Sequence, residues 1–120
     1  MNRYIDAYVL LCGQLCKTAY DYTKQNVKRH NQAMTELMRL SEQLSDDMPL
    51  AMEVYCELLK HEDLYIKHYA ASDCLRIGIH TRQAVKVLKM VCRRGDRMAA
   101  MAAKRSLEIW KGKLDPNAPF

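Results

Sequence analysis

A short pattern of small and apolar residues occurs twice in this chain, at a fixed offset of 32 residues. Both copies hold an apolar residue, a pair of alanines and a leucine at the same spacing. They are Ile66, Ala70, Ala71 and Leu75, and then Met98, Ala102, Ala103 and Leu107. Self-similarity at a fixed period is typical of repeat proteins, whose units stack to bury a shared core. Each copy contains two helical stretches around a short polar break, so the pattern predicts stacked helical hairpins.

Helix-end signals extend this interpretation along the chain. Apolar residues at helical spacing predict a first helix over about residues 4–20 and a second over about residues 23–44. A third helix is expected to start near Pro49, behind Asp46 or Asp47 as the capping residue. Three more are expected to begin at the caps Asp63, Thr81 and Asp96 and to end at Gly78, Gly95 and Gly112.

The predicted fold class is all-α, with about six helices in antiparallel hairpins that form a HEAT-like α-α superhelix. A length of 120 residues fits one domain over residues 1–120. We expect a divergent N-terminal hairpin over 1–45, repeat hairpins over 46–78 and 80–112, and an extended tail over 113–120. The weak break near Asp21 leaves open whether the first two helices are separate or one bent helix.

Composition favours a cytoplasmic protein. No apolar run approaches the length of about 18 residues that a membrane-spanning helix requires. The first residues do not resemble a signal peptide, because Asp6 enters early and the apolar stretch after it is short. We therefore expect no membrane association.

The chain has five cysteines, an odd number that argues against a full disulfide framework. All of them fall on apolar faces of predicted helices, where small hydrophobic side chains are usually buried. They are Cys12, Cys16, Cys56, Cys74 and Cys92. Cys12 and Cys16 share a helix face, a spacing that suits a metal, but no histidine or second cysteine pair accompanies them. We expect no metal and no cofactor.

Charge is distributed unevenly within the net value of +5. Residues 1–75 hold 8 Lys and Arg against 11 Asp and Glu, a net charge of −3. Residues 76–120 hold 11 against 3, a net charge of +8. The segment 42–63 is strongly acidic, with Lys60 as its single base. Such a dipolar surface steers a charged partner without specifying the sign of the partner.

Few groups are arranged for catalysis. The sequence lacks a Gly-rich phosphate loop, a Gly-x-Ser-x-Gly elbow and a His-Glu-x-x-His helix. His61 and His68, with Glu57 and Asp73, could gather as metal ligands, but their spacing matches no recognisable ligand pattern. His68 is expected on the exposed side of its helix. We expect no enzymatic activity.

Two further expectations concern large apolar side chains. The methionines mostly fall on predicted apolar stripes, which favours core filling over a binding groove. Trp110 is expected to close the open end of the last hairpin.

Outward positions of the two repeated helices form one predicted partner-binding row. Second helices of HEAT-type hairpins line the concave face, and here their outward residues are aromatic and basic. The row comprises Tyr65, Lys67, His68, Tyr69, Arg76, Arg97, Lys104 and Arg105. Protein interfaces favour Tyr and Arg, and nucleic-acid sites favour basic rows with stacking rings. An ordinary solvated face is the alternative. Several of Lys86, Lys89, Arg93 and Arg94 are expected to satisfy helix C-terminal carbonyls instead.

The chain resembles a group of small bacterial HEAT-like proteins classed as a domain of unknown function. The resemblance rests on a polar Asn in the second helix, a leucine and basic-or-His stretch, the alanine pair, and a last helix that runs into Gly and Pro. These features are Asn31, Leu58-Leu59-Lys60-His61, Ala70-Ala71 and the segment from Leu107 to Pro116. The resemblance covers about residues 5–116.

Some members of such families look like immunity proteins of contact-dependent or polymorphic toxin systems. The resemblance therefore implies a small cytosolic protein that neutralises one cognate toxin domain by binding it. The alternative is a nucleic-acid-binding module that uses the basic C-terminal half. An inhibitor that mimics nucleic acid should be acidic, and only the segment 42–63 fits that description. The sequence leaves open which surface meets the toxin domain, what that toxin does, and the oligomeric state.

Overall fold

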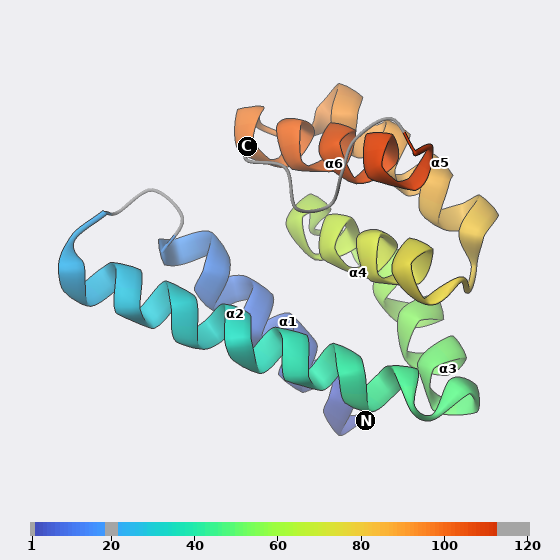
Figure 1. Cartoon of the computed structure of the whole chain (residues 1–120). Helices are drawn as coiled ribbons and strands as arrows, with labels where there is room; N and C mark the ends of the chain where they lie inside the picture. Colours follow the sequence, from blue (N-terminus) through green and yellow to red (C-terminus); the bar gives the residue numbers. More distant parts are fainter. Residues whose placement is uncertain (1, 19–21, 113–120) are drawn as a thin grey trace. The chain divides into compact units, whose positions relative to one another are not determined.

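The structure is a computed structural model that describes residues 2–18 and 22–112 (Figure 1). These residues form six α-helices and no strand, which confirms the predicted all-α class. The helices are α1 (Arg3–Thr18), α2 (Lys24–Ser45), α3 (Met48–Leu59), α4 (Leu64–Ile77), α5 (Thr81–Arg94) and α6 (Arg97–Trp110). A bilayer-spanning helix would need a longer apolar stretch than any helix in the described residues provides.

The chain divides into two compact units, Met1–Glu57 and Leu58–Phe120. The boundary lies inside α3, whereas the predicted hairpins begin and end between helices. The HEAT-like superhelix stays a prediction. The predicted end of the first helix at Tyr20, the break near Asp21 and the tail over 113–120 lie outside the described residues.

Most predicted helix ends are confirmed. The Asp63 carboxylate accepts a hydrogen bond from the Tyr65 amide at 2.8 Å and caps α4, and Asp96 caps α6 through the Ala99 amide at 2.8 Å. Gly78 ends α4 with a φ of 88°, a left-handed conformation that glycine adopts without strain. The predicted cap Thr81 is wrong: it is the first residue of α5.

The residue that precedes α5 is His80, at a φ of 47° and a ψ of 34°. Its side chain makes no capping hydrogen bond to the amides of α5. The link between α4 and α5 is the three residues 78–80, of which Gly78 and His80 both adopt the left-handed conformation. A turn this tight places Thr81 already inside the helix, where its hydroxyl cannot serve as the cap.

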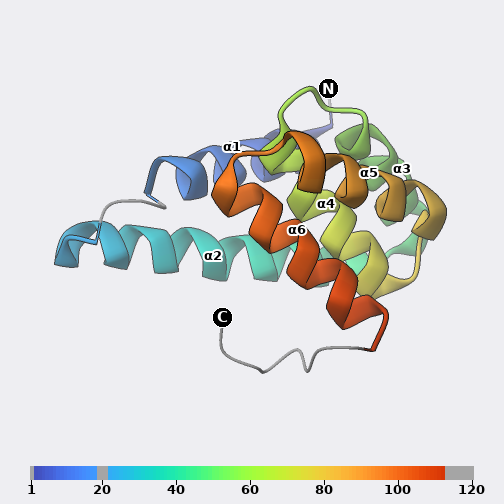
Figure 2. The same ribbon diagram turned by 90° about the horizontal axis from the view of Figure 1, so that it is seen from above.

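In the first unit, α1 and α2 lie side by side (Figure 2). Tyr55 of α3 joins their core. Its ring packs edge-on against Tyr8 with 5.8 Å between ring centroids, and its hydroxyl donates a hydrogen bond to Ser41 Oγ at 3.3 Å. Tyr8 and Tyr55 are fully buried, so α3 is fixed to both helices by one aromatic side chain.

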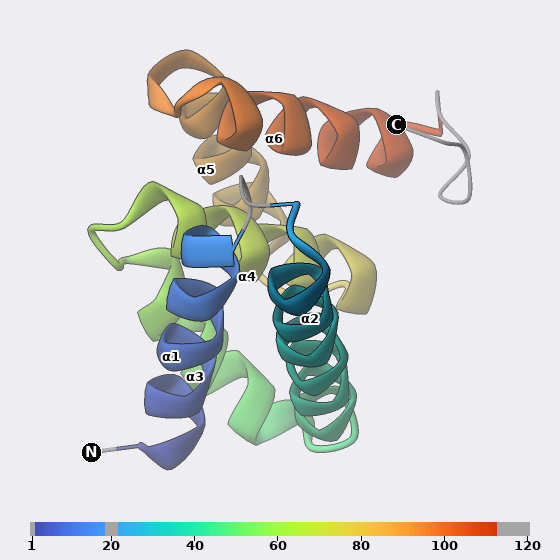
Figure 3. The same ribbon diagram turned by 90° about the vertical axis from the view of Figure 1, so that its left-hand side faces the viewer.

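In the second unit, α4 packs on α5, α5 packs on α6, and α4 also contacts α6 (Figure 3). Small residues from the repeated pattern lie at the centre of these contacts. Ala70, Ala71 and Ala103 are fully buried, and Ala102 is half-buried. The prediction that these alanines mark close helix packing is confirmed for the three buried ones.

The predicted core role of the methionines is wrong for most of them. Side chains exposed by 38–59% belong to Met38, Met48, Met52, Met98 and Met101. On α6 the reason is visible in the spacing, because Ala99, Ala103 and Leu107 already form the buried stripe. Met98 comes one residue before Ala99, and Met101 comes two residues after it. At about 100° of rotation per residue, both side chains point away from the buried stripe. Trp110 is 45% exposed, and its closing of the last hairpin stays a prediction.

The cysteines divide in the same way. Cys12 and Cys74 are buried as predicted, Cys56 and Cys92 are half-buried, and Cys16 is exposed. All of them are free thiols. The buried stripe of α1 consists of Tyr8, Leu11, Cys12 and Leu15. Cys16 lies at the edge of this narrow stripe, and its side chain is therefore exposed.

Replacing Ala71 or Ala103 with leucine should destabilise the second unit by roughly 1–3 kcal/mol, because the added atoms must displace packed neighbours. Urea unfolding followed by circular dichroism measures the loss. Met101→Leu is the matched control, since Met101 lies on the same helix as Ala103 and is 50% exposed. Unchanged midpoints for both alanine variants would show that neither residue lies at a helix crossing.

Gly95 closes the corner between α5 and α6. A Cβ atom added there would lie 2.7 Å from the Val91 carbonyl oxygen and 3.1 Å from the Ala99 Cβ. Gly95→Ala should therefore destabilise the fold by roughly 1–3 kcal/mol. Gly13→Ala is the opposite control: nothing lies within 4 Å of an added Cβ in the interior of α1. That change should stabilise by about 0.5–1 kcal/mol. Thermal melts that rank the two variants in the reverse order would contradict this account.

Candidate functional site

Two polar contacts align α4 with α6. The hydroxyl groups of Ser72 and Ser106 share a hydrogen bond of 2.8 Å, and His68 hydrogen-bonds the backbone of Ala102. His68 contacts Ala102, and four residues later on each helix Ser72 contacts Ser106. Because the contacts advance together along both helices, α4 and α6 run in the same direction (Figure 1). His68 and Ser72 therefore define the side of α4 that faces α6.

Residues three or four positions from these contacts lie beside the seam on each helix. On α4 they are Tyr65, Tyr69 and Arg76, and on α6 they include Met98 and Arg105. Helical geometry places both groups on the same side of the seam, opposite the side on which Ala71 and Ala103 are buried. We call this surface the α4–α6 face; it comprises Tyr65, Tyr69, Arg76, Met98, Met101 and Arg105.

Three aromatic rings form a cluster at the start of this face. The ring centroids of Tyr65 and Tyr69 are 5.3 Å apart, and those of His68 and Tyr69 are 4.9 Å apart, both in edge-to-face contact. Tyr65 and Tyr69 are half-buried, so each presents part of its ring to solvent. Such edge-to-face pairs add to the hydrophobic effect and hold the rings in fixed orientations.

His68 lies beneath these rings, and the prediction that it is exposed is wrong. Its side chain is 7% exposed, because α6 covers the side of α4 on which it lies. Burial lowers the pKa of His68 from 6.5 to about 4, and its hydrogen bond with the Ala102 backbone partly opposes that shift. Nδ1 has no hydrogen-bond partner among the described residues. The imidazole is therefore a neutral part of the seam at neutral pH.

The structure separates the predicted partner-binding row into different surfaces. Arg105 joins Tyr65, Tyr69 and Arg76 on the α4–α6 face. Arg97 and Lys104 are exposed and lie on the side of α6 away from α4, since Lys104 follows Ala102 by two residues, or about 200° around the helix.

The remaining basic residues of the row differ from one another. Lys67 is half-buried and precedes His68 by one residue, so it points about 100° away from the seam contact. Arg76 is exposed and forms an ion pair with Asp73, with 3.6 Å between its Nη2 and Oδ1. This exposed pair contributes little to stability, but it halves the positive charge that α4 presents.

Sequence reasoning missed the methionines of this face. Met98 corresponds to the buried Ile66 in the repeat and was therefore expected in the core. The available signal was the stripe Ala99, Ala103 and Leu107, which already supplies a complete buried face for α6.

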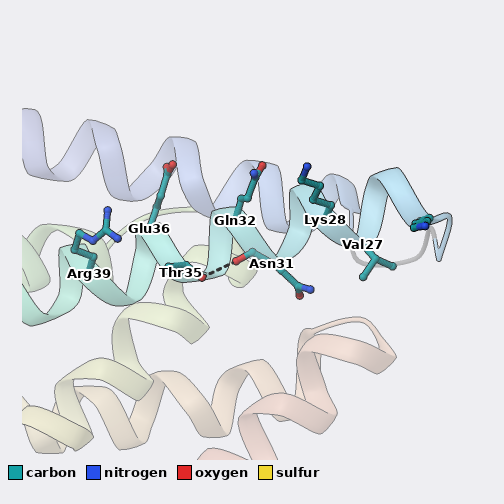
Figure 4. Close-up of a pocket in the computed structure, with 8 residues that line it drawn as sticks. Val27, Lys28, Asn31, Gln32, Thr35, Glu36 and Arg39 are labelled. Carbon is teal, nitrogen blue, oxygen red and sulfur yellow. Dashed lines mark hydrogen bonds between the residues drawn. The ribbon is translucent and has the colours of Figure 1, made fainter.

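The first unit has a shallow hollow along α2, shown in Figure 4. Lys28, Gln32 and Glu36 project from one side of the helix, and Val27 and Asn31 project from another. Thr35 donates a hydrogen bond to the Asn31 carbonyl at 2.9 Å, as residues within a helix commonly do. The lining side chains carry mixed charge and are exposed, so the hollow does not bring reactive groups together.

Within residues 2–18 and 22–112, no three His, Cys, Asp or Glu side chains gather as metal ligands. His61 Nδ1 instead accepts a hydrogen bond from the Asp63 amide at 3.1 Å, in the turn before α4.

No protein-family model, curated protein or solved structure matches this chain.

The buried His68 should make the second unit sensitive to acid. Because its pKa falls from 6.5 to about 4 on folding, the unfolded chain binds more protons between these two pH values. Stability from this residue is therefore complete above its unfolded pKa and is lost as the pH falls toward 4, by up to roughly 3 kcal/mol.

Urea unfolding of the parent chain and of His68→Phe, from about pH 4 to pH 7, isolates this contribution as the difference between the two pH profiles. The variant should lose less stability on acidification. NMR titration of the His68 ring in the folded parent is an independent check if the variant folds poorly. A ring that titrates near its usual pKa would contradict the burial of a neutral imidazole.

Proposed function

We propose that this protein is a non-catalytic protein-binding module that binds its partner through the α4–α6 face. The observation that carries this proposal is the composition of that face, on which two half-buried tyrosines lie beside exposed methionine and arginine. Tyr, Met and Arg are enriched in protein interfaces, and Tyr and Arg dominate their binding energy. An ordinary solvated face would instead be dominated by Lys and Glu.

The support beneath the face suits tight binding. Tyr65 and Tyr69 are held against each other and against the buried His68 before any partner arrives. Their helix, α4, is joined to α6 by the Ser72–Ser106 hydrogen bond, and both α4 and α6 contact α5. A surface that is already ordered loses little conformational entropy on association.

The more specific proposal is that the partner is a bacterial toxin domain that this protein neutralises. It rests on the sequence resemblance to small bacterial HEAT-like proteins, some members of which look like immunity proteins. Arg105 and Arg76 place guanidinium groups on the face, which suit carboxylate acceptors, so the complementary surface of the toxin domain should carry carboxylates beside an apolar patch. Binding alone would neutralise the toxin by covering its active site or a surface that it needs.

The test uses a toxin domain encoded beside this gene, with protection measured in cells and affinity measured by calorimetry. Tyr69→Ala and Arg105→Glu should each weaken the complex by tenfold or more and abolish protection, because each removes or reverses an interface anchor. Both variants should retain the circular dichroism spectrum of the parent.

Lys104→Glu is the matched control, since Lys104 neighbours Arg105, undergoes the same charge reversal and lies on the other side of α6. It should protect as well as the parent. A second control reverses Asp46 and Asp47 to lysine in the acidic segment 42–63. If only this last variant loses protection, the interface lies in that segment. If Lys104→Glu loses protection and Arg105→Glu does not, the α4–α6 face is the wrong surface.

A further inference from the structure

One face of α5 consists of evenly spaced cations. Arg82, Lys86, Lys89 and Arg93 are all exposed, and their spacing of four, three and four residues places them in one line along the helix. The line is about 16 Å long, at a rise of 1.5 Å per residue. It lies opposite Ala84, Leu88 and Val91, which α5 buries. We call these four residues the α5 basic ridge.

The charges of this ridge are not neutralised within the described structure. No Asp or Glu occurs between Thr81 and Arg94. The four residues make no ion pair with any other described residue. In the part of the chain that the structure describes, Arg93 and Arg94 do not donate hydrogen bonds to the C-terminal carbonyls of α5. The expectation that these two residues satisfy the helix C-terminus is therefore wrong.

Two cations of α6 extend the ridge at its edge. Cys92 Sγ lies 3.8 Å from the Ala100 carbonyl oxygen, so Ala100 marks the side of α6 that faces α5. Arg97 and Lys104 are three residues before and four residues after Ala100, which places both beside that contact. The nearest acids by sequence are Asp96, which caps α6, and the half-buried Glu108. Positive charge therefore predominates around the α5–α6 pair.

We propose that the α5 basic ridge binds the phosphate backbone of double-stranded nucleic acid without reading its sequence. This goes beyond the proposed protein binding, since it uses a different surface of the same unit. A duplex carries one phosphate on each strand for about every 3.4 Å of its helix axis, so cations spread over about 16 Å lie within reach of several phosphates. Phosphate binding of this kind requires cations and no apolar anchor.

The composition of the ridge favours this ligand over the alternatives. No large apolar side chain of α5 is exposed, whereas a protein interface or a membrane-surface helix needs such anchors. Single-stranded nucleic acid is bound by aromatic rings that stack on its bases, and α5 has no aromatic residue. Cations alone, in a straight line, suit the regular backbone of a duplex.

Fluorescence anisotropy with a labelled duplex of about 20 base pairs tests the proposal across a range of salt concentrations. The logarithm of affinity should fall linearly with the logarithm of salt concentration, with a slope between about −3 and −4 for four phosphate contacts. The quadruple variant Arg82→Gln, Lys86→Gln, Lys89→Gln and Arg93→Gln should lose at least tenfold in affinity at low salt. Lys86→Gln alone should reduce the slope by about one.

The matched control removes the same number of charges from α2, through Lys24→Gln, Lys28→Gln, Arg29→Gln and Arg39→Gln, all at exposed positions. It should bind the duplex as the parent does. Equal losses of duplex affinity in both quadruple variants would mean that only net charge matters, and this would overturn the proposal. Absence of duplex binding by the parent chain at low salt would overturn it too. Equal affinity for anionic phospholipid vesicles or for poly-glutamate would also overturn it. Tyr69→Ala should leave duplex binding unchanged, so failure here is separable from failure of the protein-binding proposal.

Discussion

The hydrogen bond between Ser72 and Ser106 fixes how α6 sits against α4, and the surfaces of the second unit follow from that contact. At 2.8 Å, the two hydroxyl groups meet between parallel helices, and His68 meets the Ala102 backbone one turn earlier. Alone such a bond between two half-buried hydroxyl groups contributes only about 0.5–1.5 kcal/mol, and it acts together with the burial of His68 against α6. The buried alanines allow the helices to approach closely enough for the bond to form.

This alignment separates two kinds of chemistry within one small unit. Aromatic, methionine and arginine side chains lie on the α4–α6 face, where a partner protein would find ordered apolar surface beside charge. Cations without apolar neighbours lie on the α5 basic ridge, where only an anionic polymer would be held. Because Arg105 and Lys104 are adjacent in sequence but belong to different sides of α6, a helix of 14 residues can serve both surfaces.

Much of the fold follows from local rules. Asp63, Asp96 and Gly78 mark helix ends by chemistry that acts within a few residues, so they were predicted correctly. Burial was predicted less well, because it depends on which neighbours a helix meets. His68 was expected in solvent and lies beneath two tyrosines, and Met98 was expected in the core and is exposed. The contact between α4 and α6 buried His68, whereas the buried stripe Ala99, Ala103 and Leu107 left Met98 outside the core.

By itself the sequence determined the all-α class, the caps, the buried alanines and the concentration of positive charge after residue 75. These depend on helical periodicity, backbone hydrogen bonding and composition, which are properties of short segments. Only the tertiary structure decided that the predicted row of eight residues belongs to more than one surface, and that the line of cations on α5 makes no ion pair with another residue of the described ranges 2–18 and 22–112. The physical reason is that a helix rotates by about 100° per residue, so the side on which a residue functions depends on where the adjacent helix makes contact.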